Sequence, residues 1–119
     1  MRLNHINLVV TKMAAAVSLF EKHFGFTCTE VKGNNIVSIL KGEDDFTLVL
    51  MISKEGDFTF PSAFHIGFMQ TTSQEVEVIY QKLINSGIDI AHKPGKIRDS
   101  FGFYFLFDNL MIEVGHYLN

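Results

Sequence analysis

The sequence predicts an α+β fold in which two tandem βαβββ modules form a curled, cup-shaped mixed sheet with helices on the outside. Two features of the chain lead to this class. The pattern of one strand, one helix and three strands occurs twice along the sequence. In addition, His5 and His65 mark the same point of each copy, 60 residues apart. We therefore expect a single domain over residues 1–119, made of module 1–59 and module 62–119.

The first module begins with a strand over residues 3–10, where β-branched and apolar residues dominate. A helix follows within residues 12–24, because apolar side chains recur there at helical spacing. Thr11 is expected to cap the start of this helix, and Gly25 stands where a glycine commonly ends one. Three further strands are predicted at residues 26–32, 34–41 and 46–53, with a turn at 42–45 between the last two.

The second module repeats this order. Its first strand is predicted at residues 64–70. Thr72 and Glu75 have the spacing of a capping box, which predicts the start of the second helix. Apolar residues at helical spacing continue the helix until it stops at Gly87. Three strands are then predicted at residues 88–94, 99–107 and 110–118.

Charge and composition exclude several classes of protein. The net charge of −3 argues against a nucleic-acid binder, which usually carries a basic surplus. No apolar run approaches the roughly 18 residues that cross a membrane, and no signal peptide is recognisable. We therefore expect a cytoplasmic protein without nucleic-acid or membrane partners. Cys28 is the only cysteine, so no internal disulfide forms, and a small buried residue is expected there.

Three polar residues stand in otherwise apolar strands. Alternation along a strand places His5, His65 and Glu113 on the face that is predicted to line the cup. A carboxylate in such a strand needs a partner, because burying an unpaired charge is costly. Two histidines and one carboxylate that converge on a cavity hold a divalent metal and leave positions for water or substrate. Alternatively, these three groups bond to one another or to a ligand in a metal-free cup.

A tyrosine is predicted beside the carboxylate. If Asp108 and Asn109 form a two-residue turn, the two last strands pair so that Tyr104 lies opposite Glu113 on the same face. The phenol there can donate a hydrogen bond to a ligand or act as an acid. One additional residue in the turn would move Tyr104 to the other face.

Three further residues are candidates for substrate contacts. Lys96 and Arg98 belong to a basic loop that precedes the last hairpin. This loop is either a flexible flap that holds an anionic group of the substrate or an ordinary solvated loop. Asn7 follows His5 by two residues and shares its face, so it either touches substrate or has a structural role.

The stretches "LNHINLVV", "FHIGF" and "FYFLFDNLMIEV" give the chain a resemblance to the vicinal oxygen chelate superfamily. This superfamily includes glyoxalase I, fosfomycin-resistance enzymes, extradiol dioxygenases and bleomycin-resistance proteins. The resemblance implies paired βαβββ modules, a metal at His5, His65 and Glu113, and a homodimer. It leaves open whether a site is built within one chain or across two. Alignment of the two modules places Val49 in the slot of Glu113, so the fourth, carboxylate ligand of glyoxalase I is absent.

The resemblance implies a metal-dependent enzyme that acts on a small molecule with vicinal oxygens. One divalent ion, which could be Mn, Ni, Zn or Fe, would act as a Lewis acid, and Glu113 and Tyr104 would be the catalytic residues. A lyase, isomerase, transferase or dioxygenase reaction is possible. The alternative is a metal-free protein that binds a drug or metabolite, as bleomycin-resistance proteins do. A degenerate member that serves as an oligomerisation or regulatory module is a third option.

Overall fold

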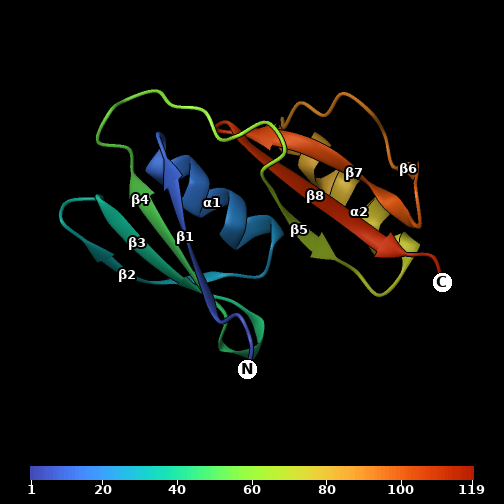
Figure 1. Cartoon of the computed structure of the whole chain (residues 1–119), viewed down its shortest axis with the longest axis horizontal. Coiled ribbons are helices and arrows are strands. Elements are labelled where there is room, and N and C mark those ends of the chain that lie inside the picture. Colours follow the sequence, from blue (N-terminus) through green and yellow to red (C-terminus); the bar gives the residue numbers. More distant parts are fainter. The chain divides into compact units, whose positions relative to one another are not determined.

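The computed structural model describes all residues from 1 to 119 and contains two compact units, Met1–Phe58 and Thr59–Asn119. Each unit has one strand, then one helix, then three strands (Figure 1). This order confirms the predicted α+β class and the tandem βαβββ modules. Neither helix is long and apolar enough to cross a membrane.

The first unit forms a four-stranded mixed sheet in the order β1-β4-β3-β2. Strand β1 runs parallel to β4, while the β4–β3 and β3–β2 pairs are antiparallel. A short 3₁₀ turn, Glu43–Asp45, lies within the predicted turn between β3 and β4. The elements are β1 (His5–Val10), α1 (Met13–His23), β2 (Thr27–Lys32), β3 (Val37–Lys41) and β4 (Thr47–Ile52).

The second unit repeats this topology in the order β5-β8-β7-β6. The parallel pair is β5–β8, and its register matches that of β1–β4: Gly67 pairs with Glu113 as Asn7 pairs with Val49. The predicted valine in the slot of the carboxylate is therefore confirmed. The elements are β5 (His65–Met69), α2 (Ser73–Asn85), β6 (Gly95–Ile97), β7 (Ser100–Phe107) and β8 (Leu110–Tyr117).

Each sheet has a helix on one face, and the core of each unit lies between the two. In the second unit the ring of Tyr80 on α2 meets the ring of Phe103 on β7 edge-on, with centroids 5.3 Å apart. Because strand side chains alternate, one face of each strand packs against the helix and the other face points away from it. We call that other face the site face. The residues buried at 2% exposure or less include Leu8, Ala16, Phe20, Leu40, Leu48 and Leu50 in the first unit, and Val76, Leu83, Phe103, Ile112 and Val114 in the second.

Helix α1 begins one residue later than predicted. Lys12, not Thr11, is the N-cap residue, and no side chain caps this end. The reason is that the Lys12 carbonyl accepts the first helical hydrogen bond, from Ala16 N–H at 3.0 Å. The other end follows the prediction, because Gly25 comes directly after the C-cap residue with a φ of +72°.

Helix α2 has the predicted cap. Thr72 is the N-cap residue, and its hydroxyl accepts a hydrogen bond from the Glu75 backbone N–H at 3.1 Å. The Glu75 carboxylate in turn accepts from the hydroxyls of Thr72 and Thr71, at 3.0 and 2.6 Å. These two hydroxyls lower the pKa of Glu75.

Replacing Thr72 by alanine leaves the Glu75 N–H without its capping acceptor. We expect the free energy of unfolding to fall by about 1 kcal/mol. Thr71→Ala is the matched control, because it removes a hydroxyl that also touches Glu75 but caps no backbone group. Urea denaturation compares the two variants, and equal losses would contradict the cap as the source of the effect.

The prediction of a strand at residues 88–94 is wrong. That segment has no regular structure, and the short strand β6 begins at Gly95, within the predicted basic loop. Pro94 has no N–H to donate to a sheet, which favours a start after it. The segment is instead held by the side chain of Ile90, which is buried in the hydrophobic core at 8% exposure.

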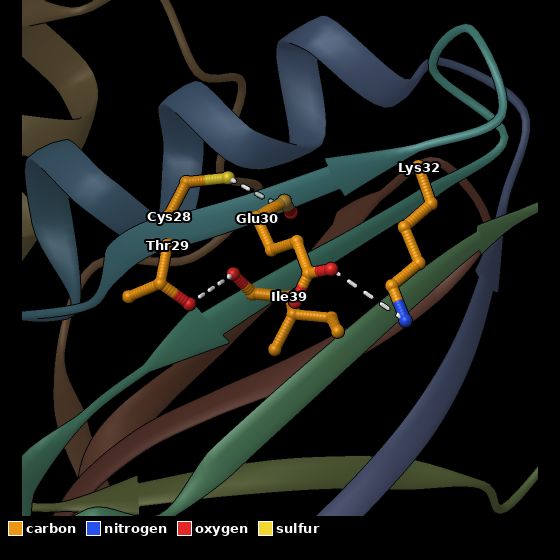
Figure 2. A network of polar contacts seen from close by, with 5 residues as sticks. All are labelled: Cys28, Thr29, Glu30, Lys32 and Ile39. Atoms are coloured by element: carbon orange, nitrogen blue, oxygen red, sulfur yellow. Dashed lines mark hydrogen bonds and ion pairs between the residues drawn. The ribbon is translucent and has the colours of Figure 1, made fainter.

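Strand β2 is an edge strand with a bulge. Cys28 pairs with Leu40 and Glu30 with Ile39, so Thr29 is the additional residue. Figure 2 shows the Thr29 hydroxyl donating to the Ile39 carbonyl at 3.3 Å and the Cys28 sulfur turned to the Glu30 carbonyl at 3.7 Å. Because it lies on this edge, Cys28 is half-buried, not fully buried as expected.

Candidate functional site

The site face of the second unit brings a histidine and a carboxylate together. His65 begins β5, and Glu113 lies in the middle of the neighbouring strand β8. The His65 Nε2 and Glu113 Oε1 atoms are 3.5 Å apart. The Glu113 side chain is only 17% exposed and that of His65 is 42% exposed, so the carboxylate is largely shielded while the imidazole remains accessible.

The ring of His65 is held by its other nitrogen. His65 Nδ1 lies 3.1 Å from the Ala63 carbonyl, which can only accept a hydrogen bond. A neutral ring therefore carries its proton on Nδ1 and directs the Nε2 lone pair toward Glu113. This is the arrangement that metal-binding histidines commonly have.

The distance between the two donor atoms also fits a metal. Nitrogen and oxygen ligands lie about 2.1 Å from a divalent ion, so two neighbouring ligands are roughly 3.0–3.4 Å apart. The separation of 3.5 Å is close to this range. The residues of the second unit are therefore suited to supply two metal ligands. No three His, Cys, Asp or Glu side chains gather as a metal-binding group in the structure.

Tyr104 lies beside this pair, as predicted. Asp108 and Asn109 both have positive φ angles, 49° and 67°, which is the geometry of a type I′ turn. The turn fixes the hairpin register and pairs Tyr104 with Glu113 on the site face. The Tyr104 ring also meets the His65 ring edge-on, with centroids 5.7 Å apart.

The surroundings of Tyr104 keep its phenol protonated. Partial burial raises its pKa most, followed by the negative charge of Glu113 and the hydrogen bond to that carboxylate, while the charge of Arg98 lowers it. The phenol is therefore a hydrogen-bond donor throughout the neutral range.

Removing the charge of Glu113 should lower the pKa of Tyr104. In Glu113→Gln the phenolate no longer faces a carboxylate, so it forms at lower pH, while burial still holds the pKa above its ordinary value. Ultraviolet titration of the metal-free protein measures this, with Tyr104→Phe identifying the signal. An unchanged Tyr104 pKa in Glu113→Gln would mean that the two groups do not interact.

The two basic residues, Arg98 and Lys96, lie in different surroundings. Arg98 occupies the turn between β6 and β7 with a φ of 53°, and its charge reaches Tyr104. Lys96 pairs with Phe101, which places it on the helix-bearing face. The structure therefore brings Arg98, but not Lys96, to the surroundings of Tyr104 and Glu113.

Gly67 is a site residue that the sequence analysis did not single out. A Cβ atom at this position would lie 3.4 Å from Glu113 Oε1. Any larger side chain would thus cover the carboxylate oxygen that faces His65. A glycine within a strand is the signal that could have revealed this close approach.

The other two predicted site residues belong to the first unit. His5 and Asn7 lie on the site face of β1, and both side chains already have partners. His5 Nδ1 is 2.7 Å from Asn4 Oδ1, and the Asn7 amide donates to the Met51 sulfur at 3.0 Å. His5 is exposed.

The fold and site together define a class: tandem βαβββ proteins with a histidine on the first strand of each module and a carboxylate on the last strand. The model of the glyoxalase/bleomycin resistance protein/dioxygenase superfamily matches residues 2–114. The chain therefore belongs to this superfamily. Its members commonly use a divalent metal, act on small molecules and often form dimers.

Several solved structures are similar to this chain. A possible glyoxalase from Bacillus cereus is 34% identical with a TM-score of 0.80, and the match covers 96% of this chain and 97% of that one. A glyoxalase/dioxygenase from Nostoc punctiforme is 24% identical, with a TM-score of 0.78 and coverage of 98% and 90%. The fosfomycin resistance protein FosX from Listeria monocytogenes is 17% identical, with a TM-score of 0.78 and coverage of 97% and 90%. The last two show the shared fold alone. A search of curated protein sequences found no match.

Proposed function

We propose that this chain is a metal-dependent enzyme that acts on a small molecule with vicinal oxygens. His5, His65 and Glu113 would hold one divalent ion, and Mn, Ni, Zn and Fe are the candidates. The proposal rests mainly on one observation: His65 Nε2 lies 3.5 Å from Glu113 Oε1 while its Nδ1 is engaged by a carbonyl. His5 would complete the set, either from the same chain or from the partner chain of a homodimer.

A bound divalent ion supplies Lewis-acid polarisation of the substrate oxygens. Tyr104 is the residue suited to donate a hydrogen bond to a developing oxyanion, since its phenol stays protonated in the neutral range. Glu113 lies opposite Tyr104 across the β7–β8 hairpin, so its carboxylate faces the phenol. Both residues are therefore the proposed catalytic pair, and Tyr104 also contacts the substrate.

Two residues are proposed to orient the substrate. Arg98 lies near enough to Tyr104 to affect its pKa, so it can take an anionic substituent beside the reacting oxygens. Asn7 offers an amide on the site face of the first unit, next to Val49. The predicted contact of Lys96 would require its side chain to reach around the edge strand β6.

One observation favours a second function, a metal-free binding protein. Glu113 lies 3.5 Å from His65 and faces Tyr104, so a protonated His65 ring would balance its charge without a metal. In that case the site face would bind a small molecule through these three groups and would carry out no reaction.

Activity assays distinguish the two functions. The protein is stripped with a chelator, reloaded with Mn, Ni, Zn or Fe(II), and assayed with fosfomycin plus water or a thiol, with an α-hydroxy ketone for isomerisation, and with a catechol under oxygen. We expect turnover that requires metal and falls at least tenfold in Tyr104→Phe. Binding of a probe without metal, together with no turnover under any loading, would instead support the binding protein.

A further inference from the structure

Asn4 lies directly before β1 and holds the ring of His5. Its side-chain Oδ1 is 2.7 Å from His5 Nδ1. The residue is fixed by its backbone, because the Asn4 carbonyl accepts a hydrogen bond from the Thr47 N–H at 2.8 Å. This bond extends the β1–β4 ladder by one residue, so the amide is presented to His5 from an ordered position.

In the second module, a different group accepts the hydrogen bond from the histidine. The residue that corresponds to Asn4 is Phe64, whose ring stacks on Phe60 with centroids 4.8 Å apart and cannot accept from an imidazole. There the Ala63 carbonyl takes the bond from His65 Nδ1 instead. Both histidines of the site faces thus have an oxygen acceptor at Nδ1, although the two acceptors differ in chemistry and in position along the chain.

We propose that Asn4 is a positioning residue that keeps the proton of His5 on Nδ1 and leaves its Nε2 lone pair free for a divalent ion. The inference rests on the proposed function. An acceptor at one ring nitrogen fixes both the tautomer and the orientation of a metal-binding imidazole. Without this acceptor, a neutral His5 ring would place its proton on either nitrogen. Metal binding would then require the proton to move from Nε2 to Nδ1 in part of the molecules.

The two orientations of the Asn4 amide make opposite predictions. With Oδ1 toward the ring, His5 carries its proton on Nδ1. With the amide nitrogen toward the ring, Asn4 donates to Nδ1 and the proton moves to Nε2, where it blocks a metal. The tautomer of His5 in the metal-free protein therefore tests the inference without any measurement of activity.

The experiment measures this tautomer by long-range ¹H–¹⁵N NMR at a pH where free imidazole is neutral, and then the affinity for Zn²⁺ by calorimetry. We expect wild type and Asn4→Asp, whose carboxylate only accepts, to show the Nδ1–H form and to bind Zn²⁺. Asn4→Leu has a similar volume and no acceptor, and we expect it to populate the Nε2–H form and to bind Zn²⁺ about 10–100-fold more weakly.

His5→Ala separates failure of the inference from failure of the proposed function. If His5→Ala weakens Zn²⁺ binding while Asn4→Leu changes neither tautomer nor affinity, His5 is a ligand but Asn4 does not position it. If His5→Ala leaves Zn²⁺ binding unchanged, the metal site itself is wrong. An Nε2–H tautomer in the wild-type protein would overturn the inference directly. Asn4→Asp serves as the second variant should Asn4→Leu fail to fold.

Discussion

Replacing Glu113 by glutamine is expected to weaken divalent-metal binding by roughly 100-fold or more. The amide keeps the size of the side chain, but it removes the negative charge that lies beside His65 Nε2 and replaces one of the two carboxylate oxygens by an NH₂ group that cannot bind a metal. Loss of a residue that only orients a ligand already costs about 10–100-fold in affinity. Loss of the sole carboxylate of the proposed set should cost at least as much. Calorimetric titration of Zn²⁺ or Mn²⁺ into the chelator-treated protein measures the change.

Glu77→Gln is the matched control for this prediction. Glu77 is an exposed carboxylate on α2, so the substitution makes the same change of charge away from the site. We expect its metal affinity to equal that of the wild type. Equal losses in both variants would attribute the effect to net charge, and no loss in Glu113→Gln would remove Glu113 from the ligand set.

Gly102→Ala should lower the free energy of unfolding by about 2–3 kcal/mol. A Cβ atom at Gly102 would lie 2.3 Å from the Val114 carbonyl oxygen and 2.7 Å from Gly115 Cα. Both are backbone atoms of β8, which cannot turn aside as a side chain can. The β7–β8 hairpin that pairs Tyr104 with Glu113 must therefore shift to admit the methyl group.

The partner of Gly102 across the sheet provides the control. Gly95 on β6 pairs with Gly102, but a Cβ atom there would meet nothing within 4 Å. Urea denaturation should show little change for Gly95→Ala. If the two variants lose the same stability, the close approach of β7 and β8 is not what requires a glycine at residue 102.

The sequence predicted most reliably where a local rule fixes the geometry. The two-residue turn at Asp108 and Asn109 was enough to pair Tyr104 with Glu113, because a hairpin register follows from its turn. The Thr72–Glu75 spacing located the start of α2 for a similar reason. Because the pattern is duplicated, the order of elements in one module also predicted the order in the other.

What the sequence analysis missed depended on packing between elements and on side-chain conformation. Residues 88–94 have strand-like composition, yet the paired strand starts at Gly95 because Pro94 and the position of β7 decide where pairing begins. The contact between Asn4 and His5 could not be read from alternation along a strand, since it depends on the side-chain conformations of two adjacent residues. Gly67 was not singled out because it has no side chain, and it affects the site only through the space that it leaves beside Glu113.

The two modules differ on their site faces. In the second, Glu113 pairs with Tyr104, and at the same positions of the first, Val49 pairs with Ile39. Only the histidines at the start of β1 and β5 remain in common. Under the proposed function, the first module therefore contributes one ligand and the second contributes two ligands and the phenol.

The most direct test is the metal content per chain, measured by elemental analysis on untagged protein and on Glu113→Ala prepared in the same way. We predict close to one divalent ion per chain in the wild type, little in the variant, and an element whose identity narrows the reaction type. No bound metal in either protein, even after reconstitution with Mn, Ni, Zn and Fe(II), would contradict the metal-dependent enzyme and favour the metal-free binding protein.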